Sequence, residues 1–352
     1  MTTVATTQRK NNDLPWLVGL AVLFVIGIVA WIVQLTQGFA VLGLNQAVTW
    51  GTYIAAFFLL VGAGAGLVLL AAFSDLAVLP ALKGLRSPLL LGALGAFVAA
   101  AFMILLDVGK PERVVFMLSY PNFKSMFVWD FYTLVLAGVL ALAYFYLGPK
   151  IKLLPWIAAI AAAAVVVVEG FILTVSAATP MWHGAVVPAL FLIEGLITAF
   201  AIVLIAKNVQ VIGRILAALL AVVFLLSVVE FVTVSYGGQP DIVANYAVLT
   251  AGSLAPLFWG QLLLGVIVPF VLLVWFAQNR TAVIAAGVLA ILGVFVTKLD
   301  LLVSGQAIPF LGQPVTYVPT LVEMGGVLGG LGLAGLVFVL ANRYLPSKAE
   351  AK

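Results

Sequence analysis

Ten runs of apolar residues, each long enough to cross a membrane, constrain this sequence more than any other feature. A transmembrane helix needs about 20 apolar residues to span a hydrocarbon core of about 30 Å. Only 8% of the residues are charged, against about 25% in a soluble domain, which excludes a water-soluble enzyme, a nucleic-acid-binding protein and a disordered chain. We predict an all-α integral membrane protein with about ten transmembrane helices. The predicted spans are 16–34, 47–73, 88–106, 126–147, 153–175, 185–206, 211–234, 256–276, 282–303 and 320–340.

The placement of lysine and arginine predicts the orientation. Ten spans put both termini on one side, and 12 of the 16 basic residues flank the spans on that side. Because cytoplasmic loops carry the excess of Lys and Arg, we predict cytoplasmic termini and a multi-pass protein of the cell inner membrane. The expected organisation is a cytoplasmic tail at 1–14, a transmembrane domain at 15–342 and a second cytoplasmic tail at 343–352. No small-residue cleavage site follows the first span, so we expect a retained helix and not a signal peptide.

The residues available for metal binding are few. Cysteine is absent and His183 is the only histidine. The chain therefore offers no thiolates for an iron–sulfur cluster or a zinc site, and no pair of histidines for a b-type haem. We expect no metal, haem or iron–sulfur cluster to be held by this chain.

Charged residues inside the spans are expensive and usually functional. Most of them fall in the outer half of the membrane under the predicted orientation, which favours a site that opens to the outer face over a transporter site near the midplane. For the acids at helix ends, contact with headgroup water is the alternative explanation. Lys298 and Asp300 are two residues apart on one helix, so each needs a partner on a neighbouring helix. The intramembrane set is Asp107, Asp130, Glu169, Glu194, Glu230, Lys298, Asp300 and Glu323.

The loop between the third and fourth spans contains the three basic residues that break the charge rule. It reads Asp107-Val-Gly-Lys-Pro-Glu-Arg113 and then Tyr120-Pro-Asn-Phe-Lys-Ser-Met-Phe-Val-Trp-Asp130. We assign its polar residues either to partner binding or to the structure of the loop. These residues are Lys110, Arg113, Asn122, Lys124 and Ser125.

This loop pattern resembles the polysulfide-reductase membrane-subunit family, also called NrfD/PsrC. The Trp50-Gly51 start of the second span, its Gly62-Ala-Gly-Ala-Gly66 run and the segment Tyr317-Val-Pro-Thr-Leu-Val-Glu323 are similar to that family as well. The glycine run by itself fits ordinary helix packing. Ten spans resemble the longer branch, with hydrogenase-2 and sulfite-reduction-associated membrane subunits. The resemblance implies two four-helix bundles plus two extra helices.

The resemblance also implies a quinone-reactive anchor of a respiratory oxidoreductase complex, which is not catalytic alone. Its substrate would be menaquinone or ubiquinone, and it would exchange electrons with a ferredoxin-like iron–sulfur or multihaem cytochrome c partner at the periplasmic face. A catalytic subunit such as a molybdopterin enzyme would complete the complex. Either direction of electron flow is open at this point.

Specific roles follow for the candidate residues. Asp130 and Asp107 are the expected catalytic proton acceptors, because quinol oxidation releases two protons with two electrons. Trp50 and Trp129 are expected walls of the quinone site, and Tyr53 and His183 are expected hydrogen-bond partners of the quinone. The expected proton path consists of Glu169, Glu194, Glu230, Lys298, Asp300 and Glu323.

Two rival interpretations remain open from the sequence. The chain could be a secondary transporter or ion channel, in which Glu194, Lys298 and Asp300 form the relay. It could also be a purely structural anchor that has lost quinone binding.

Overall fold

The computed structural model describes residues 13–148, 150–176, 179–307 and 315–345, and within these ranges it is helical with no β-strand. Ten helical segments are long and apolar enough to cross a membrane, as the sequence predicts. The spans are α2 (Leu14–Gln37), α3 (Thr52–Asp75), α4 (Arg86–Asp107), α6 (Met126–Leu147), α7 (Leu154–Thr174), α8 (Val187–Ala206), α9 (Gln210–Gly237), the α11–α12 segment (Ala255–Trp275), α13 (Arg280–Ala307) and α14 (Leu321–Tyr344).

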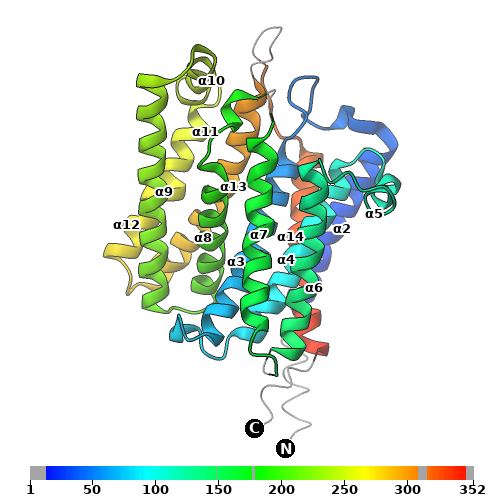
Figure 1. Cartoon of the computed structure of the whole chain (residues 1–352), viewed down its shortest axis with the longest axis vertical. Helices are drawn as coiled ribbons and strands as arrows, with labels where there is room; N and C mark the ends of the chain where they lie inside the picture. The colour runs from blue at the N-terminus through cyan, green and yellow to red at the C-terminus, as the bar shows by residue number, and fades with distance from the viewer. Residues whose placement is uncertain (1–12, 149, 177–178, 308–314, 346–352) are drawn as a thin grey trace, which may run out of the picture.

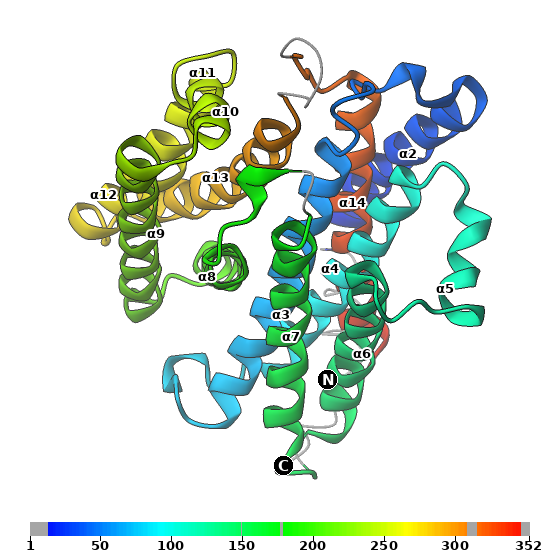
Figure 2. The ribbon, with the colours of Figure 1, turned by 45° about the horizontal axis from the view of Figure 1, so that its top comes forward.

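The contacts among the spanning helices define two four-helix groups and one pair, which confirms the expected architecture. Figures 1 and 2 show their arrangement. In the first group α3, α4, α6 and α7 pack in a ring, and in the second α8, α9, α12 and α13 do the same. The two groups meet where α3 packs against α8 and α13. Helices α2 and α14 pack on each other and cover α4.

Helix α3 is the centre of the molecule, because every residue from Thr52 to Ala72 is buried. A Cβ added to Gly62 would lie 3.3 Å from the backbone of Gly195 on α8, and one added to Gly66 would collide with the same backbone. Glycine at these positions allows the two helix backbones to approach closely. The glycine run therefore serves helix packing, as its spacing predicts.

The α2–α14 pair fixes where the chain enters and leaves the bundle. The backbone of Gly27 approaches Gly329, and the backbone of Leu20 approaches Gly332, so the two helices are antiparallel. Helix α2 therefore begins at the end where α14 finishes (Figure 1). We call this the termini end. The opposite end, where α3 and α6 begin and α7 and α13 finish, is the site end.

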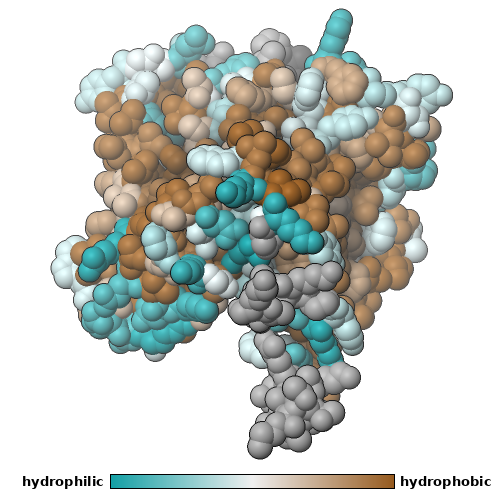
Figure 3. All heavy atoms as spheres, turned by 60° about the horizontal axis from the view of Figure 1, so that its bottom comes forward, coloured by the Kyte–Doolittle hydropathy of each residue, from teal (hydrophilic) through white to brown (hydrophobic). Residues whose placement is uncertain are grey.

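The flanks of the bundle suit a lipid environment. Large apolar side chains are exposed along α2, α6 and α9. Figure 3 shows hydrophobic residues over the sides, whereas hydrophilic residues gather toward the termini end. The chain is therefore built with an apolar exterior, which is the inverse of a soluble protein surface.

Three details differ from the sequence prediction. Two further helices lie outside the spans, α5 (Phe116–Ser119) and α10 (Pro240–Thr250). The eighth span is interrupted by a π-helical stretch, Gln261–Ile267, between α11 (Ala255–Gly260) and α12 (Val268–Trp275). There the backbone of Gly265 contacts that of Gly293 on α13.

The second span starts five residues later than predicted, and the reason is local hydrogen bonding. Residues 47–51 are not helical. The Asn45 carboxamide oxygen accepts hydrogen bonds from the amides of Ala47 (3.0 Å) and Val48 (2.9 Å), which stabilises a turn in place of a helix. This extended entry segment forms part of the site described next.

Candidate functional site

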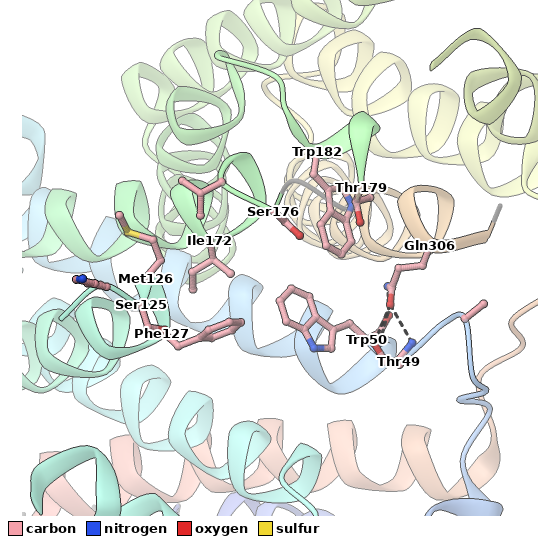
Figure 4. A pocket seen from close by; sticks show the side chains of 13 residues that line it. Thr49, Trp50, Ser125, Met126, Phe127, Ile172, Ser176, Thr179, Trp182 and Gln306 are labelled. Carbon is pink, nitrogen blue, oxygen red and sulfur yellow. Dashed lines mark hydrogen bonds between the residues drawn. The ribbon is translucent and has the colours of Figure 1, made fainter. Parts of the chain in front are cut away.

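A cavity of about 510 Å³ opens at the site end, between the entry segment of α3 and the ends of α6, α7 and α13 (Figure 4). Its walls are aromatic and apolar, and polar side chains surround them. The lining includes Trp50, Phe127, Trp182, Met126 and Ile172 as apolar groups, and Lys124, Ser125, Ser176, Thr179 and Gln306 as polar ones.

Three aromatic rings line one side of the cavity. The indole rings of Trp50 and Trp182 are stacked, with centroids 5.5 Å apart and planes 12° apart. Phe127 meets Trp50 edge-on at 5.6 Å. The Trp182 indole N–H donates a hydrogen bond of 2.8 Å to the carbonyl of Leu301, so this ring is fixed against α13. The aromatic side of the cavity is therefore held in place by ring packing and by one hydrogen bond.

Gln306 holds the entry segment in place. Its side-chain oxygen accepts hydrogen bonds from the amides of Thr49 (2.8 Å) and Trp50 (3.1 Å). Its side-chain nitrogen donates to the carbonyl of Trp50 at 2.9 Å (Figure 4). The carboxamide of a residue on α13 thus replaces the helical hydrogen bonds that residues 47–51 do not make.

Of the four residues predicted to bind quinone, only Trp50 lines this cavity. Tyr53 is 2% exposed and its hydroxyl donates to the carbonyl of Val322 on α14 at 3.3 Å. Trp50 lies before α3 begins, so it does not share a helix with Tyr53.

Trp129 and His183 also lie outside the cavity lining. The Trp129 indole donates to the carbonyl of Phe123 at 2.9 Å, and 44% of the side chain is exposed. His183 is exposed, with Nδ1 2.7 Å from the carbonyl oxygen of Thr174. Its neighbour Trp182 occupies the position in the cavity wall instead.

The loop residues have two separate placements. Lys124 and Ser125 reach the cavity, whereas Lys110 and Arg113 are exposed away from it. Asn122 shapes the turn, because its side-chain oxygen accepts from the amide of Lys124 at 3.1 Å and its carbonyl from that of Ser125 at 2.9 Å. The second half of the loop between the third and fourth spans therefore faces the cavity, and its first half does not.

Two buried carboxyl groups lie beneath the cavity. Asp130 is one helical turn along α6 from the lining residue Phe127, and Glu169 is one turn along α7 from the lining residue Ile172. Their exposures are 8% and 0%. Among the described residues, Oδ1 of Asp130 and both carboxyl oxygens of Glu169 have no hydrogen-bond partner. The two groups lie within electrostatic range of each other.

The polar groups continue toward the middle of the bundle. Glu169 lies within electrostatic range of Lys298 on α13. The Lys298 ammonium forms an ion pair with Glu194 on α8 and lies 2.9 Å from the centroid of the Phe191 ring. The prediction that Lys298 pairs with a neighbouring helix is confirmed. Buried ionisable side chains on α6, α7, α8 and α13 therefore lie near one another in the bundle.

Asp300 has no corresponding pairing. It is 4% exposed, and neither carboxyl oxygen has a hydrogen-bond partner among the residues that the structure describes. A partner on a neighbouring helix, which the sequence predicts, is not found within that part of the chain.

A second acidic cluster lies apart from the cavity, against α14. The Glu323 carboxylate accepts hydrogen bonds from the Tyr317 hydroxyl (2.5 Å) and the amides of Gly43 (2.8 Å) and Thr320 (2.9 Å). With Thr320 it forms a capping box at the start of α14. Burial raises the pKa of Tyr317 above its usual range, so the phenol remains a donor.

This cluster brings together two of the acids that the sequence selects. Asp107, at the end of α4, lies within electrostatic range of Glu323 and Tyr53 and is not grouped with Asp130. The cause is that α4 packs on α14, whereas Asp130 neighbours α7. Glu323 is engaged by backbone and phenol donors, so it forms part of the helix cap and is separate from the chain of buried groups below the cavity.

Glu230 is also separate from the predicted proton path. It is exposed on α9, and its electrostatic neighbour is Tyr246 on α10. The second group of helices places α9 away from α6 and α7, so a similar depth in the membrane does not bring Glu230 beside Glu169. In the described part of the chain, no three His, Cys, Asp or Glu residues are clustered so that they could hold a metal ion.

Trp182, Gln306, Ser176, Thr179 and Phe127 are lining residues that the sequence analysis did not select. Trp182 and Thr179 lie one and four residues before His183 in the chain, and Gln306 is a polar residue at the end of a span. None of them has a spacing pattern that singles it out. They meet at one place only because α3, α6, α7 and α13 pack together.

The apolar exterior, the ten spanning helices and the buried charges define a multi-pass integral membrane protein. The sequence matches the family model described as Polysulphide reductase, NrfD, over residues 40–310. The chain therefore belongs to the NrfD family, which confirms the resemblance seen in the loop motif.

Two curated relatives extend along nearly the whole chain. A protein of Halobacterium salinarum, described as a putative membrane subunit of dimethyl sulfoxide reductase, is 27% identical, covering 96% of this chain and 92% of that protein. A selenate reductase subunit of Mesobacillus selenatarsenatis is 20% identical, covering 93% of this chain and 92% of that protein.

Proposed function

We propose that this chain is the quinone-reactive membrane anchor of a respiratory reductase complex in the cell inner membrane. The observation that carries the proposal is the aromatic-walled cavity at the site end, which lies one helical turn above two buried carboxyl groups without hydrogen-bond partners among the described residues. Family membership supports the proposal, as do the two relatives, both of which are named as subunits of reductases.

The cavity chemistry fits a quinone head group. The stacked indoles of Trp50 and Trp182 offer a flat apolar surface to a planar ring. The hydroxyl groups of Ser125, Ser176 and Thr179 lie around the same space and can donate to quinone oxygens. Lys124 adds a positive charge at the rim. Menaquinone and ubiquinone share the ring and its oxygens, so the proposal is for a quinone of this class.

Proton balance assigns a role to the acids below the cavity. Oxidation of one quinol releases two electrons and two protons, and the electrons leave to a partner protein. We assign Asp130 and Glu169 as the proton acceptors closest to the cavity, with the Lys298–Glu194 pair deeper in the bundle. The cavity opens at the site end, so the released protons exchange on that side of the membrane.

The partner and the direction of electron flow follow from the same reasoning. This chain has no cysteine and one histidine, so the electrons need a redox centre on another chain. An iron–sulfur or multihaem protein docked at the site end, on the periplasmic side, would be nearest the cavity. The relatives named as reductase subunits favour quinol oxidation, with the electrons passed to a catalytic partner.

A second candidate function rests on the Lys298–Glu194 pair. A buried ion pair between two helices of a bundle is also found in secondary transporters and ion channels. Purified protein in vesicles distinguishes the two functions, because a transporter moves ions or solutes across the membrane without added quinone or partner proteins.

The test of quinone reactivity is Asp130→Asn in the assembled complex. The amide keeps the side-chain shape but cannot accept a proton, so quinol-linked turnover should fall about tenfold or more. Activity of the catalytic partner with an artificial dye should not change. Glu112→Gln is the matched control, because Glu112 is an exposed acid in the loop at the same end and should leave turnover unchanged. Normal quinol turnover in Asp130→Asn would remove this residue from proton transfer.

A further inference from the structure

A second cavity, of about 560 Å³, lies at the termini end between α9 and α12. It is formed by the first turns of α9 and by the end of α12, whereas the first cavity lies where α7 and α13 finish. The two cavities are therefore at opposite ends of the bundle. Nothing in the proposed quinone chemistry uses the second one.

The lining of this cavity changes from polar to apolar along the helix axis. On α9, Gln210 and Arg214 are followed at helical spacing by Ala217 and Ala218, so the four residues form one stripe that runs inward from the helix end. On the facing side, Gln278 lies just beyond α12, and Phe270 lies deeper along it. The polar groups are therefore at the end of the bundle, with small and apolar side chains behind them.

The cavity also has a single formal charge, on an exposed side chain. Arg214 is the only charged residue in its lining, and it makes no ion pair or hydrogen bond within the described part of the chain. The nearby Arg280 shows the contrast, because its guanidinium donates to the carbonyls of Leu204 (2.8 Å) and Ile205 at the end of α8. Arg214 is thus available to a ligand, whereas Arg280 already has acceptors.

These features select a ligand with an anionic head and an apolar tail. A small soluble anion would use Arg214 but would leave the apolar wall of Ala218 and Phe270 without a partner. An uncharged apolar molecule would leave the guanidinium unpaired. The bilayer itself supplies molecules with both properties, and basic pockets between transmembrane helices are known to hold lipid headgroups.

We propose that this cavity binds one anionic glycerophospholipid. Its phosphate contacts Arg214, the carboxamides of Gln210 and Gln278 donate hydrogen bonds to the headgroup, and an acyl chain lies along Ala218 and α12. Trp275, which is 66% exposed at the mouth, sits where indole rings favour the headgroup level. The lipid would fill the gap between α9 and α12 in the second four-helix group.

The test is lipid retention by the purified full-length protein, measured by native mass spectrometry after detergent exchange and after incubation with phosphatidylglycerol nanodiscs. Wild-type protein should keep about one phosphatidylglycerol. Arg214→Gln should lower its occupancy about fivefold, the size expected for one basic contact with a headgroup. Lys83→Gln removes the same charge from an exposed loop residue outside the cavity and should retain the lipid.

A second variant keeps the proposal testable if Arg214→Gln does not fold. Ala218→Trp fills the apolar part of the cavity without a change of charge, and it should also lose the lipid. Equal retention by wild type and both variants overturns the proposal. The proposal is also overturned if inorganic phosphate displaces the bound lipid and Ala218→Trp retains the lipid fully. Those two results together would indicate a site for a simple anion. Quinol turnover in Asp130→Asn is independent of these outcomes.

Discussion

Replacing Lys298 by methionine tests whether the buried Lys298–Glu194 pair carries charge. Both residues are 2% exposed, and Lys298 contacts the apolar ring of Phe191. Methionine has a similar length and removes only the ammonium. The variant leaves Glu194 buried without its partner on α13.

The expected cost follows from this burial. Breaking a buried ion pair by removing one partner costs about 3–5 kcal/mol, because an uncompensated charge remains. If the pair is instead a neutral hydrogen bond, its loss costs about 1 kcal/mol. We expect the larger value, which is about 100-fold or more in the unfolding equilibrium. The double variant Glu194→Gln, Lys298→Met removes both charges and should recover most of the lost stability.

The assay is a double-mutant cycle on the purified protein, with reversible unfolding measured by steric trapping in detergent micelles or bicelles. The single variant Glu194→Gln completes the cycle. A cost near 1 kcal/mol for Lys298→Met, or a double variant as unstable as the single ones, would refute the ionic description of the pair.

Three further predictions concern packing, the helix cap and orientation. Gly195→Val should abolish folding, because the new Cβ would meet the Gly62 backbone at 2.9–3.3 Å. Gly138→Val is the control, because a Cβ there meets open space and the variant should express normally. Size-exclusion chromatography compares the two variants. Tyr317→Phe should lower stability by about 1–3 kcal/mol in thermal unfolding, since the phenol bridges Thr52 and the Glu323 carboxylate. No loss of stability would mean that water replaces the hydroxyl. A cytoplasm-dependent reporter fused after Lys352 should be active, and activity of a periplasm-dependent reporter at this position would contradict the predicted orientation.

The sequence by itself determined the transmembrane architecture. The number of crossings follows from the length of each apolar run and the thickness of the bilayer, and neither quantity depends on how the helices pack. The sequence also determined that Lys298 needs a partner, because an isolated ammonium inside the membrane is costly wherever its helix lies. The loop motif was specific enough to indicate the family, which the match over residues 40–310 confirms.

Only the tertiary structure decided which residues share a site. Gln306 and Trp50 are 256 residues apart, and their hydrogen bonds keep the entry segment out of the helix that apolarity predicts. Similar depth in the membrane suggested that Asp107 belongs with Asp130 and Glu230 with Glu169, but lateral packing places Asp107 beside α14 and Glu230 beside α10. Hydropathy reports how far along a helix a residue lies. The direction in which the residue points depends on side-chain packing between helices that are distant in the sequence, and this is why the cavity, its aromatic wall and its acids became visible only in the folded chain.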